Sequence, residues 1–172
     1  SAGYAAANKA QSNGAKVAII DKGPLGGLCI LRGCMPTKAI LRSSDILALI
    51  HRAKEFGLSV SNPSANLSLI NDRKNQLINE FANYRIKQLN DPKFKLIEEH
   101  ASFLSPNKLK VGDQILSAKN FIIATGSRVA DFPIPGLSKA GFFTSDDLLE
   151  LREIPESMIV LGAGPVAVEL AQ

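Results

Sequence analysis

The spacing of hydrophobic residues predicts helices over the first half of the chain. Residues 3–12 are rich in alanine, the residue with the highest helix propensity, so we expect a helix there. A second helical pattern covers residues 36–56, where Ile40, Leu47 and Ile50 recur on one face. The second stretch therefore predicts an amphipathic helix that packs through one side.

A third helical pattern precedes the turn Asn90-Asp91-Pro92, which stops it. Its apolar stripe consists of Ile70, Leu77, Phe81 and Tyr84. Hydrophobic residues that recur at helical spacing face the core of a globular protein. We therefore expect this stripe to be the buried face of the helix.

Short apolar runs predict the strands. Residues 16–21, KVAIID, have the pattern of a buried strand that ends in an acid. After Lys93 the hydrophobic period changes to two, which predicts a β-meander that returns into a buried strand at residues 121–126. A short helix capped by residues 144–147 follows, and Pro155 separates it from a further apolar strand.

The order of these elements predicts an α/β fold. A helix followed by a strand that ends in an acid is half of a βαβ unit, which indicates a Rossmann-like domain. We expect such a domain, with a β-meander, over residues 1–155 and the start of a second Rossmann-like domain over residues 156–172. Ser1 starts inside a helical run and Gln172 stops inside another, so we expect a fragment of a longer chain.

Composition limits the classes of function. With 172 residues, 45% of them hydrophobic, the chain can fill one ordinary globular domain. The net charge of +4 is spread along the sequence, with no Trp and only two Tyr, so no nucleic-acid-binding surface is predicted. No apolar run approaches the roughly 20 residues of a membrane span, and the first residues lack a signal-peptide pattern. We therefore expect a soluble, cytoplasmic protein.

The segment GGLCILRGCMPTK carries the most specific chemistry. A straight helix would hold Cys29 and Cys34 too far apart for a disulfide, whose Cα atoms lie about 4.4 to 6.8 Å apart. Gly33 and Pro36 allow a distorted turn into a helix start, which would bring the two sulfurs together. A helix N-terminus and the cation of Lys38 both favour a thiolate. These features predict a reactive, reversible disulfide.

Two unrelated buried cysteines, or half of a zinc site, are the alternative interpretations of this segment. A zinc site needs about four ligands. His51 and His100 are the two histidines of the chain, and both are badly spaced relative to the cysteines. We therefore predict no metal site.

Two glycine-containing turns indicate dinucleotide binding. Gly162-x-Gly164-x-x-Ala167 follows an apolar strand and precedes a helix, whose N-terminus would face a pyrophosphate. Gly3 fits the last glycine of a similar turn, and Asp21 follows the next strand, where an acid binds ribose hydroxyls. The alternatives are a solvated acid at a strand end and a small-residue turn that packs a helix on a sheet.

These motifs together resemble a known family. The cysteine segment resembles the redox-active signature GGTCxNxGCxPSK of the class I pyridine nucleotide-disulfide oxidoreductases, which include dihydrolipoamide dehydrogenase, glutathione reductase and mercuric reductase. FIIATGSR, residues 121–128, resembles the second FAD fingerprint of that family. The resemblance covers the whole chain. It implies an FAD-binding domain over residues 1–155 and the beginning of an NAD(P)-binding domain over residues 156–172.

The resemblance also implies residue roles. Cys29 would attack the substrate, Cys34 would contact the flavin, and Lys38 would stabilise negative charge on the reduced flavin. Cofactor contacts are implied at Ser1, Gly3, Asp21, Lys22, Gly27, Cys29, Lys38, His100, Ala101, Ala124, Thr125, Gly126, Ser127, Gly162, Gly164 and Glu169. The implied cofactors are FAD and NAD(P)H, and the implied substrate is a small-molecule disulfide or dithiol, or a metal ion. A homodimer with a role in cell redox homeostasis is implied as well.

Some residues depart from the family pattern. Leu28 replaces a threonine that helps to hold the FAD pyrophosphate, and Ile30-Leu31-Arg32 replaces a run that contains asparagine. Asn8 stands where glutathione reductase has its glutathione-binding arginine, which favours a dihydrolipoamide dehydrogenase-like or mercuric reductase-like enzyme.

The family's acid and base, a histidine and a glutamate, come from a C-terminal domain of the partner subunit. The chain by itself is therefore expected to be inactive. Two alternatives stay open: a flavin-binding module whose cysteines do not turn over, and a purely structural or interaction domain.

Overall fold

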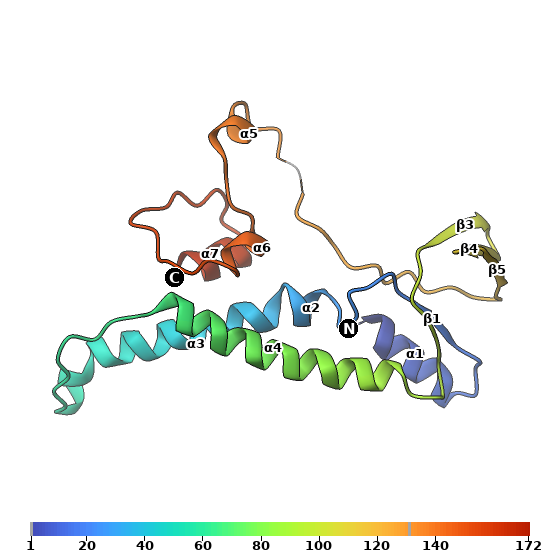
Figure 1. Ribbon diagram of the computed structural model, residues 1–172, viewed down its shortest axis with the longest axis horizontal. Helices are drawn as coiled ribbons and strands as arrows, with labels where there is room; N and C mark the ends of the chain where they lie inside the picture. Colours follow the sequence, from blue (N-terminus) through green and yellow to red (C-terminus); the bar gives the residue numbers. More distant parts are fainter. Residues whose placement is uncertain (1, 131) are drawn as a thin grey trace. The chain divides into compact units, whose positions relative to one another are not determined.

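The computed structural model describes residues 2–130 and 132–172, and it has an α/β fold, as the sequence predicts (Figure 1). Its helices are α1 (Ala2–Ser12), α2 (Leu28–Leu31), α3 (Cys34–His51), the 3-10 helix η1 (Ala53–Phe56), α4 (Leu67–Leu89), α5 (Leu137–Ala140), α6 (Ser145–Leu148) and α7 (Pro165–Ala171). Its strands are β1 (Ala18–Ile20), β2 (Lys95–Ile97), β3 (Ala101–Ser105), β4 (Lys108–Val111) and β5 (Gln114–Ser117).

The chain divides into two compact units. The first contains Ser1–Cys29 and Glu80–Ser127, and the second contains Ile30–Asn79 and Arg128–Gln172. These limits differ from the boundary expected near Pro155. The assignment of residues 1–155 and 156–172 to two nucleotide domains stays a prediction.

The first unit contains both sheets. β1 and β2 pair in parallel, with Ile19 opposite Leu96, and β3, β4 and β5 form an antiparallel sheet in chain order. Helix α1 packs beside β1, and the Tyr4 ring meets Phe94 edge-on, with 6.1 Å between ring centroids. The Arg85 guanidinium lies over the Tyr4 ring, 4.2 Å from its centre. This packing fixes the start of α1 relative to the parallel strands.

The predicted buried strands at residues 121–126 and after Pro155 are wrong for this structure. Both segments lack strand structure, and Ile123 and Ile159 are 73% and 87% exposed. A strand forms only where a neighbour satisfies its backbone N–H and C=O groups. Among the described residues no strand pairs with either segment, so their β-forming sequence has no sheet to join.

The second unit holds the helix predicted over residues 36–56, which is confirmed as α3 followed by η1. Gly57 ends η1 in the left-handed region, with a φ of 72°. Arg73 of α4 donates to the Ala39 carbonyl of α3 over 3.1 Å. α6 and α7 lie beside each other in this unit (Figure 1).

The buried face of α4 differs from the predicted apolar stripe. Phe81 and Tyr84 are 46% and 62% exposed. The residues that are buried on α4 are Asn71, Lys74, Ile78, Ala82 and Leu89. A hydrophobic pattern misses this face because two of its members are polar and are buried against specific partners rather than against apolar side chains.

Candidate functional site

The two cysteines lie on consecutive helices. Cys29 is half-buried on α2, and Cys34 is the exposed first residue of α3. Gly33 is the N-cap of α3, and its carbonyl accepts from the Thr37 hydroxyl over 2.8 Å and from the Thr37 amide over 3.3 Å. The first amides of a helix have no acceptor within it and carry partial positive charge. Cys34 therefore lies where a helix favours an anionic group.

Lys38 lies one turn after Cys34 and forms an ion pair with Glu169 of α7. The two residues are 131 positions apart in the sequence. Lys38 was predicted as the cation near Cys34, and Glu169 as a cofactor contact after the second glycine turn. The structure thus brings together the helix that begins at Cys34 and the helix that follows Gly162-x-Gly164. The contact of Lys38 with a flavin stays a prediction.

Arg32, between the two cysteines, forms an ion pair that the sequence does not predict. Its Nη1 atom lies 3.2 Å from Asp146 Oδ2 of α6, and the two side chains are 55% and 36% exposed. An ion pair this accessible contributes about 0 to 1 kcal/mol. The signal that could have pointed to Arg32 was its charge, directly after the apolar residues Cys29-Ile30-Leu31.

In the first unit, the start of α1 approaches the segment predicted as the second FAD fingerprint. A Cβ atom added at Gly3 would lie 3.4 Å from the Ala124 Cβ, so the two backbones are close. Gly126 has a φ of 75°, a conformation that side-chain-bearing residues rarely adopt, and it lies near Leu28. Ser1, also predicted here, lies outside the described residues.

Asp21 is held at the carboxyl end of the parallel strand pair. Its amide donates to the Ile97 carbonyl over 3.1 Å, and its Oδ1 accepts from the Gly23 amide over 3.0 Å. Ligands of open α/β sheets bind outside the carboxyl ends of the strands. The half-buried carboxylate is therefore oriented at the edge where a ligand is expected, with the exposed Lys22 next to it in sequence.

The other predicted contacts of the first unit lie in turns and at the start of a strand. Ala101 is the first residue of β3, opposite Val111, and His100 precedes it as an exposed residue. Gly27 lies in the turn before α2, with a φ of 87°. Thr125 and Ser127 flank Gly126 and are exposed.

The second glycine turn leads directly into α7. Gly162 has a φ of 139°, and a Cβ atom added there would lie 3.5 Å from the Ala167 Cβ. Gly164 is the N-cap of α7, with Pro165 at its first position, a common helix start. The turn and the helix of the predicted fingerprint are thus present in the structure.

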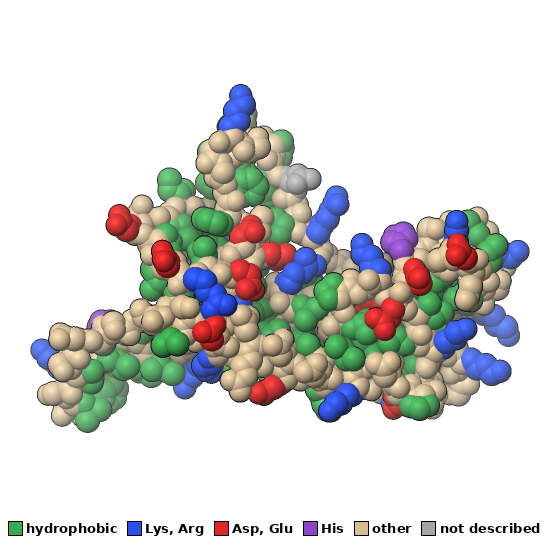
Figure 2. Space-filling view, viewed as in Figure 1, with side chains coloured by type: hydrophobic (Ala, Val, Ile, Leu, Met, Phe, Trp, Pro, Cys, Tyr) green, Lys and Arg blue, Asp and Glu red, His purple; other side chains and the backbone are tan. Residues whose placement is uncertain are grey.

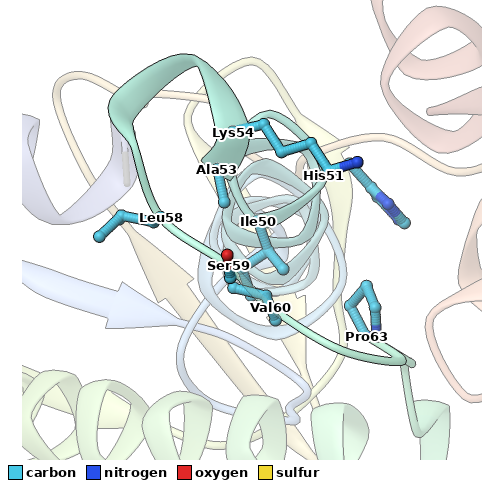
Figure 3. Close-up of a pocket in the computed structure, with 8 residues that line it drawn as sticks. All are labelled: Ile50, His51, Ala53, Lys54, Leu58, Ser59, Val60 and Pro63. Atoms are coloured by element: carbon cyan, nitrogen blue, oxygen red, sulfur yellow. The ribbon is translucent and has the colours of Figure 1, made fainter.

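A pocket of about 190 Å³ lies where α3 ends and η1 begins (Figure 3). It is lined by Ile50, His51, Ala53, Lys54, Leu58, Ser59, Val60 and Pro63. None of the predicted site residues lines it, so it is separate from the candidate site.

Charged side chains of both signs are mixed on the surface in view (Figure 2). Figure 2 shows Lys and Arg side chains scattered among Asp and Glu on the face in view. Within residues 2–130 and 132–172, no group of three or more His, Cys, Asp or Glu could hold a metal ion. No helix in the described part of the chain has the length and apolar character needed to cross a membrane.

Comparison with known proteins identifies the family. The family model described as pyridine nucleotide-disulphide oxidoreductase matches residues 1–172. The chain belongs to this family. The oxidoreductase chain is 37% identical to mercuric reductase from Staphylococcus aureus, over 99% of the chain and 31% of that protein. It is 35% identical to dihydrolipoyl dehydrogenase from Bacillus subtilis (strain 168), over 99% of the chain and 38% of that protein.

A solved structure supports the same assignment. The oxidoreductase chain matches the Cu(II) complex of the HOCl-induced flavoprotein disulfide reductase RclA from Escherichia coli with a TM-score of 0.77 and 29% identity. The match covers 99% of the chain and 36% of RclA. The chain spans about a third of the length of the curated relatives it matches. Enzymes of this family are flavoprotein oxidoreductases that use FAD and NAD(P)H, so the resemblance read from the cysteine motif is confirmed.

Proposed function

We propose that the chain is part of an FAD-dependent disulfide oxidoreductase in which Cys29 and Cys34 form the redox pair. The observation that carries this proposal is the position of Cys34 at the first residue of α3, directly after the short helix that bears Cys29. The substrate class is a small-molecule disulfide or dithiol, or a metal ion such as the name of the mercuric reductases indicates.

The residues of the first unit fit an FAD site. The close approach of Gly3 to Ala124 and the left-handed backbone of Gly126 both disfavour larger side chains, as expected where main chain lies against a ligand. The Asp21 carboxylate, oriented by the Gly23 amide, can accept hydrogen bonds from ribose hydroxyls. This part of the chain supports a Rossmann-like FAD-binding domain.

The thiol chemistry follows from the two cysteines. The Cys29 thiolate attacks one sulfur of a substrate disulfide, the S–S bond breaks, and one substrate thiolate leaves and takes up a proton. Cys34 then attacks the Cys29 sulfur, releases the second substrate thiol and closes a Cys29–Cys34 disulfide. A flavin held by the first unit would, in its reduced form, supply the electron pair that reopens this disulfide, and NAD(P)H would be the source of that pair.

The second unit supports the nicotinamide side of the reaction. Gly162 and Gly164 precede α7 as the turn that would bind the NAD(P)H pyrophosphate. The Lys38–Glu169 ion pair holds that helix to the helix of Cys34. Lys38 would stabilise negative charge that develops on the flavin, with Glu169 restraining the lysine. We place the whole protein in the cytoplasm as a homodimer that serves cell redox homeostasis.

Replacement of Cys29 in the whole, flavin-loaded protein tests the proposal. For Cys29→Ser we expect NAD(P)H-linked disulfide reduction to fall by on the order of 10³-fold or more, because the attacking thiolate is lost. Bound flavin should be unchanged. Met35→Leu, which removes the neighbouring sulfur, is the matched control and should keep full activity. Full disulfide reduction by Cys29→Ser would instead support the flavin-binding module whose cysteines do not turn over.

A further inference from the structure

Two polar side chains of α4 are fully buried and reach the same short segment of backbone. The Lys74 side chain is 2% exposed; its Nζ donates to the Leu149 carbonyl and lies 2.9 Å from Glu150 Oε1. Asn71 is 0% exposed and donates through Nδ2 to the Leu151 carbonyl. The mechanism proposed above uses neither residue.

Contacts of Arg152 extend this set of interactions by one residue. Arg152 pairs with Asp72 of α4 and donates to the Ser68 carbonyl over 3.3 Å. The first half of α4 thus holds four consecutive residues, 149–152. These residues follow α6 in no helix or strand, so their carbonyls need donors from elsewhere in the fold.

Burial of these polar side chains costs free energy of folding. A buried ammonium must be paired to be tolerated, and hydrophobic residues of similar volume often stabilise as well or better. Asn71 Oδ1 is buried without a hydrogen-bond partner, which adds a further penalty. What the polar contacts provide, and apolar packing would not, is one fixed position for residues 149–152 along α4.

The segment fixed in this way leads into the second glycine turn. Residues 153–164 form no helix or strand and are exposed. Beyond them, α7 is held to α3 by the Lys38–Glu169 pair and by Gln172, whose Nε2 lies 3.1 Å from Asp45 Oδ1. The second glycine turn therefore lies between a segment held by buried side chains of α4 and a helix, α7, that contacts α3.

We propose that Lys74 and Asn71 are positioning residues for the NAD(P)H-dependent step: they fix where the second glycine turn lies relative to the helix that begins at Cys34. This inference rests on the proposed function. A displaced turn would misplace the nicotinamide, and misplacement by about 1 Å can cost roughly 100-fold in rate. The exchange between thiols and flavin does not use this turn and should be spared.

The test separates the two half-reactions in the whole flavin-loaded protein. Flavin reduction is followed anaerobically by stopped flow, first with NADH or NADPH and then with dithiothreitol as the dithiol. For Lys74→Met we expect the nicotinamide-driven rate to fall roughly 10- to 100-fold, while the dithiol-driven rate stays within about twofold. Lys87→Met, an exposed lysine on the same helix, is the matched control and should change neither rate.

Equal losses in both rates for Lys74→Met, or no loss in either, would overturn the positioning role. If Lys74→Met does not fold, Glu150→Gln and Arg152→Gln give the same test at exposed partners, with smaller losses confined to the nicotinamide-driven rate. Failure of the proposed function is distinct, because the wild-type protein would then show no dithiol-driven flavin reduction at all.

Discussion

The two units support their predicted nucleotide contacts differently. In the first unit, Asp21 follows a strand that is paired in parallel, and the acid is oriented by backbone hydrogen bonds. Before Gly162, the apolar run has no neighbouring strand, and the turn depends on side-chain ties at both ends. The comparison teaches that a predicted nucleotide contact can be positioned either by a sheet or by polar side-chain contacts.

The largest effect is expected from a change at Gly126, in the segment of the first unit predicted as the second FAD fingerprint. Gly126→Val places a β-branched residue at a φ of 75°, with strain of order 1–3 kcal/mol, and adds a side chain where backbone is expected to face FAD. We expect most bound flavin to be lost, as measured by absorbance per chain. Gly136→Val, with a φ of 86° and open space around it, is the matched control and should retain flavin.

A change in the second glycine turn should affect binding of NAD(P)H and leave binding of the flavin unchanged. Gly162→Ala strains a residue at a φ of 139° and adds a Cβ atom 3.5 Å from the Ala167 Cβ. We expect the KM for NAD(P)H to rise roughly 5- to 30-fold, which corresponds to about 1 to 2 kcal/mol of strain, with flavin content unchanged. Gly141→Ala, also at positive φ but in open space, should leave this KM alone. Loss of flavin from Gly162→Ala would contradict the assignment of this turn to NAD(P)H rather than to FAD.

The accessible ion pair beside the cysteines should matter less. A double-mutant cycle with Arg32→Val and Asp146→Asn measures its coupling in urea unfolding. Since both side chains are more than a third exposed, we expect a coupling energy of at most about 1 kcal/mol. A coupling energy of several kcal/mol would show that Arg32 anchors the cysteine segment as firmly as Lys74 anchors residues 149–152.

The smallest effect is expected at the start of α6, which precedes the anchored segment. The Thr144 hydroxyl, 2.6 Å from Asp147 Oδ2, and then the Thr144 amide lower the pKa of Asp147 below its ordinary value of 3.8. A carboxylate whose pKa is lowered on folding stabilises the folded state above its ordinary pKa, and this contribution is lost as the pH falls through the lowered pKa.

Thermal unfolding between about pH 5 and pH 2 checks this dependence on Asp147. Asp147→Asn keeps the shape of the cap and removes the charge. We expect the wild type to be the more stable at pH 5 and its advantage to shrink as the pH falls. A difference that stays constant with pH would contradict the assignment.

What could be predicted from the sequence was local. The helices of residues 36–56 and the cap at Thr144 depend on neighbours within one or two turns, and both are found. The buried face of α4 could not be predicted in the same way. Lys74 is buried on that face because its ammonium group is paired with a carbonyl and a carboxylate that are far away in the sequence. A hydrophobic period carries no information about such partners.

The candidate site shows the same limit. The cysteine motif indicated the family because its residues are close together in the sequence. The comparisons confirm that family. The Lys38–Glu169 pair joins residues 131 positions apart, and only the fold brings them together. The predicted strands at residues 121–126 and after Pro155 failed for the complementary reason: strand formation depends on a partner, and the described residues provide none.

The exposed apolar runs have a practical consequence for anyone who produces this chain. Ile122 and Ile123 are 67% and 73% exposed, and Ile159 and Leu161 are 87% and 63% exposed. Uncharged segments of high β-propensity with free backbone groups are templates for intermolecular β-pairing. The isolated chain is therefore expected to aggregate as its concentration rises. A charged substitution such as Ile159→Lys should delay that aggregation in light scattering.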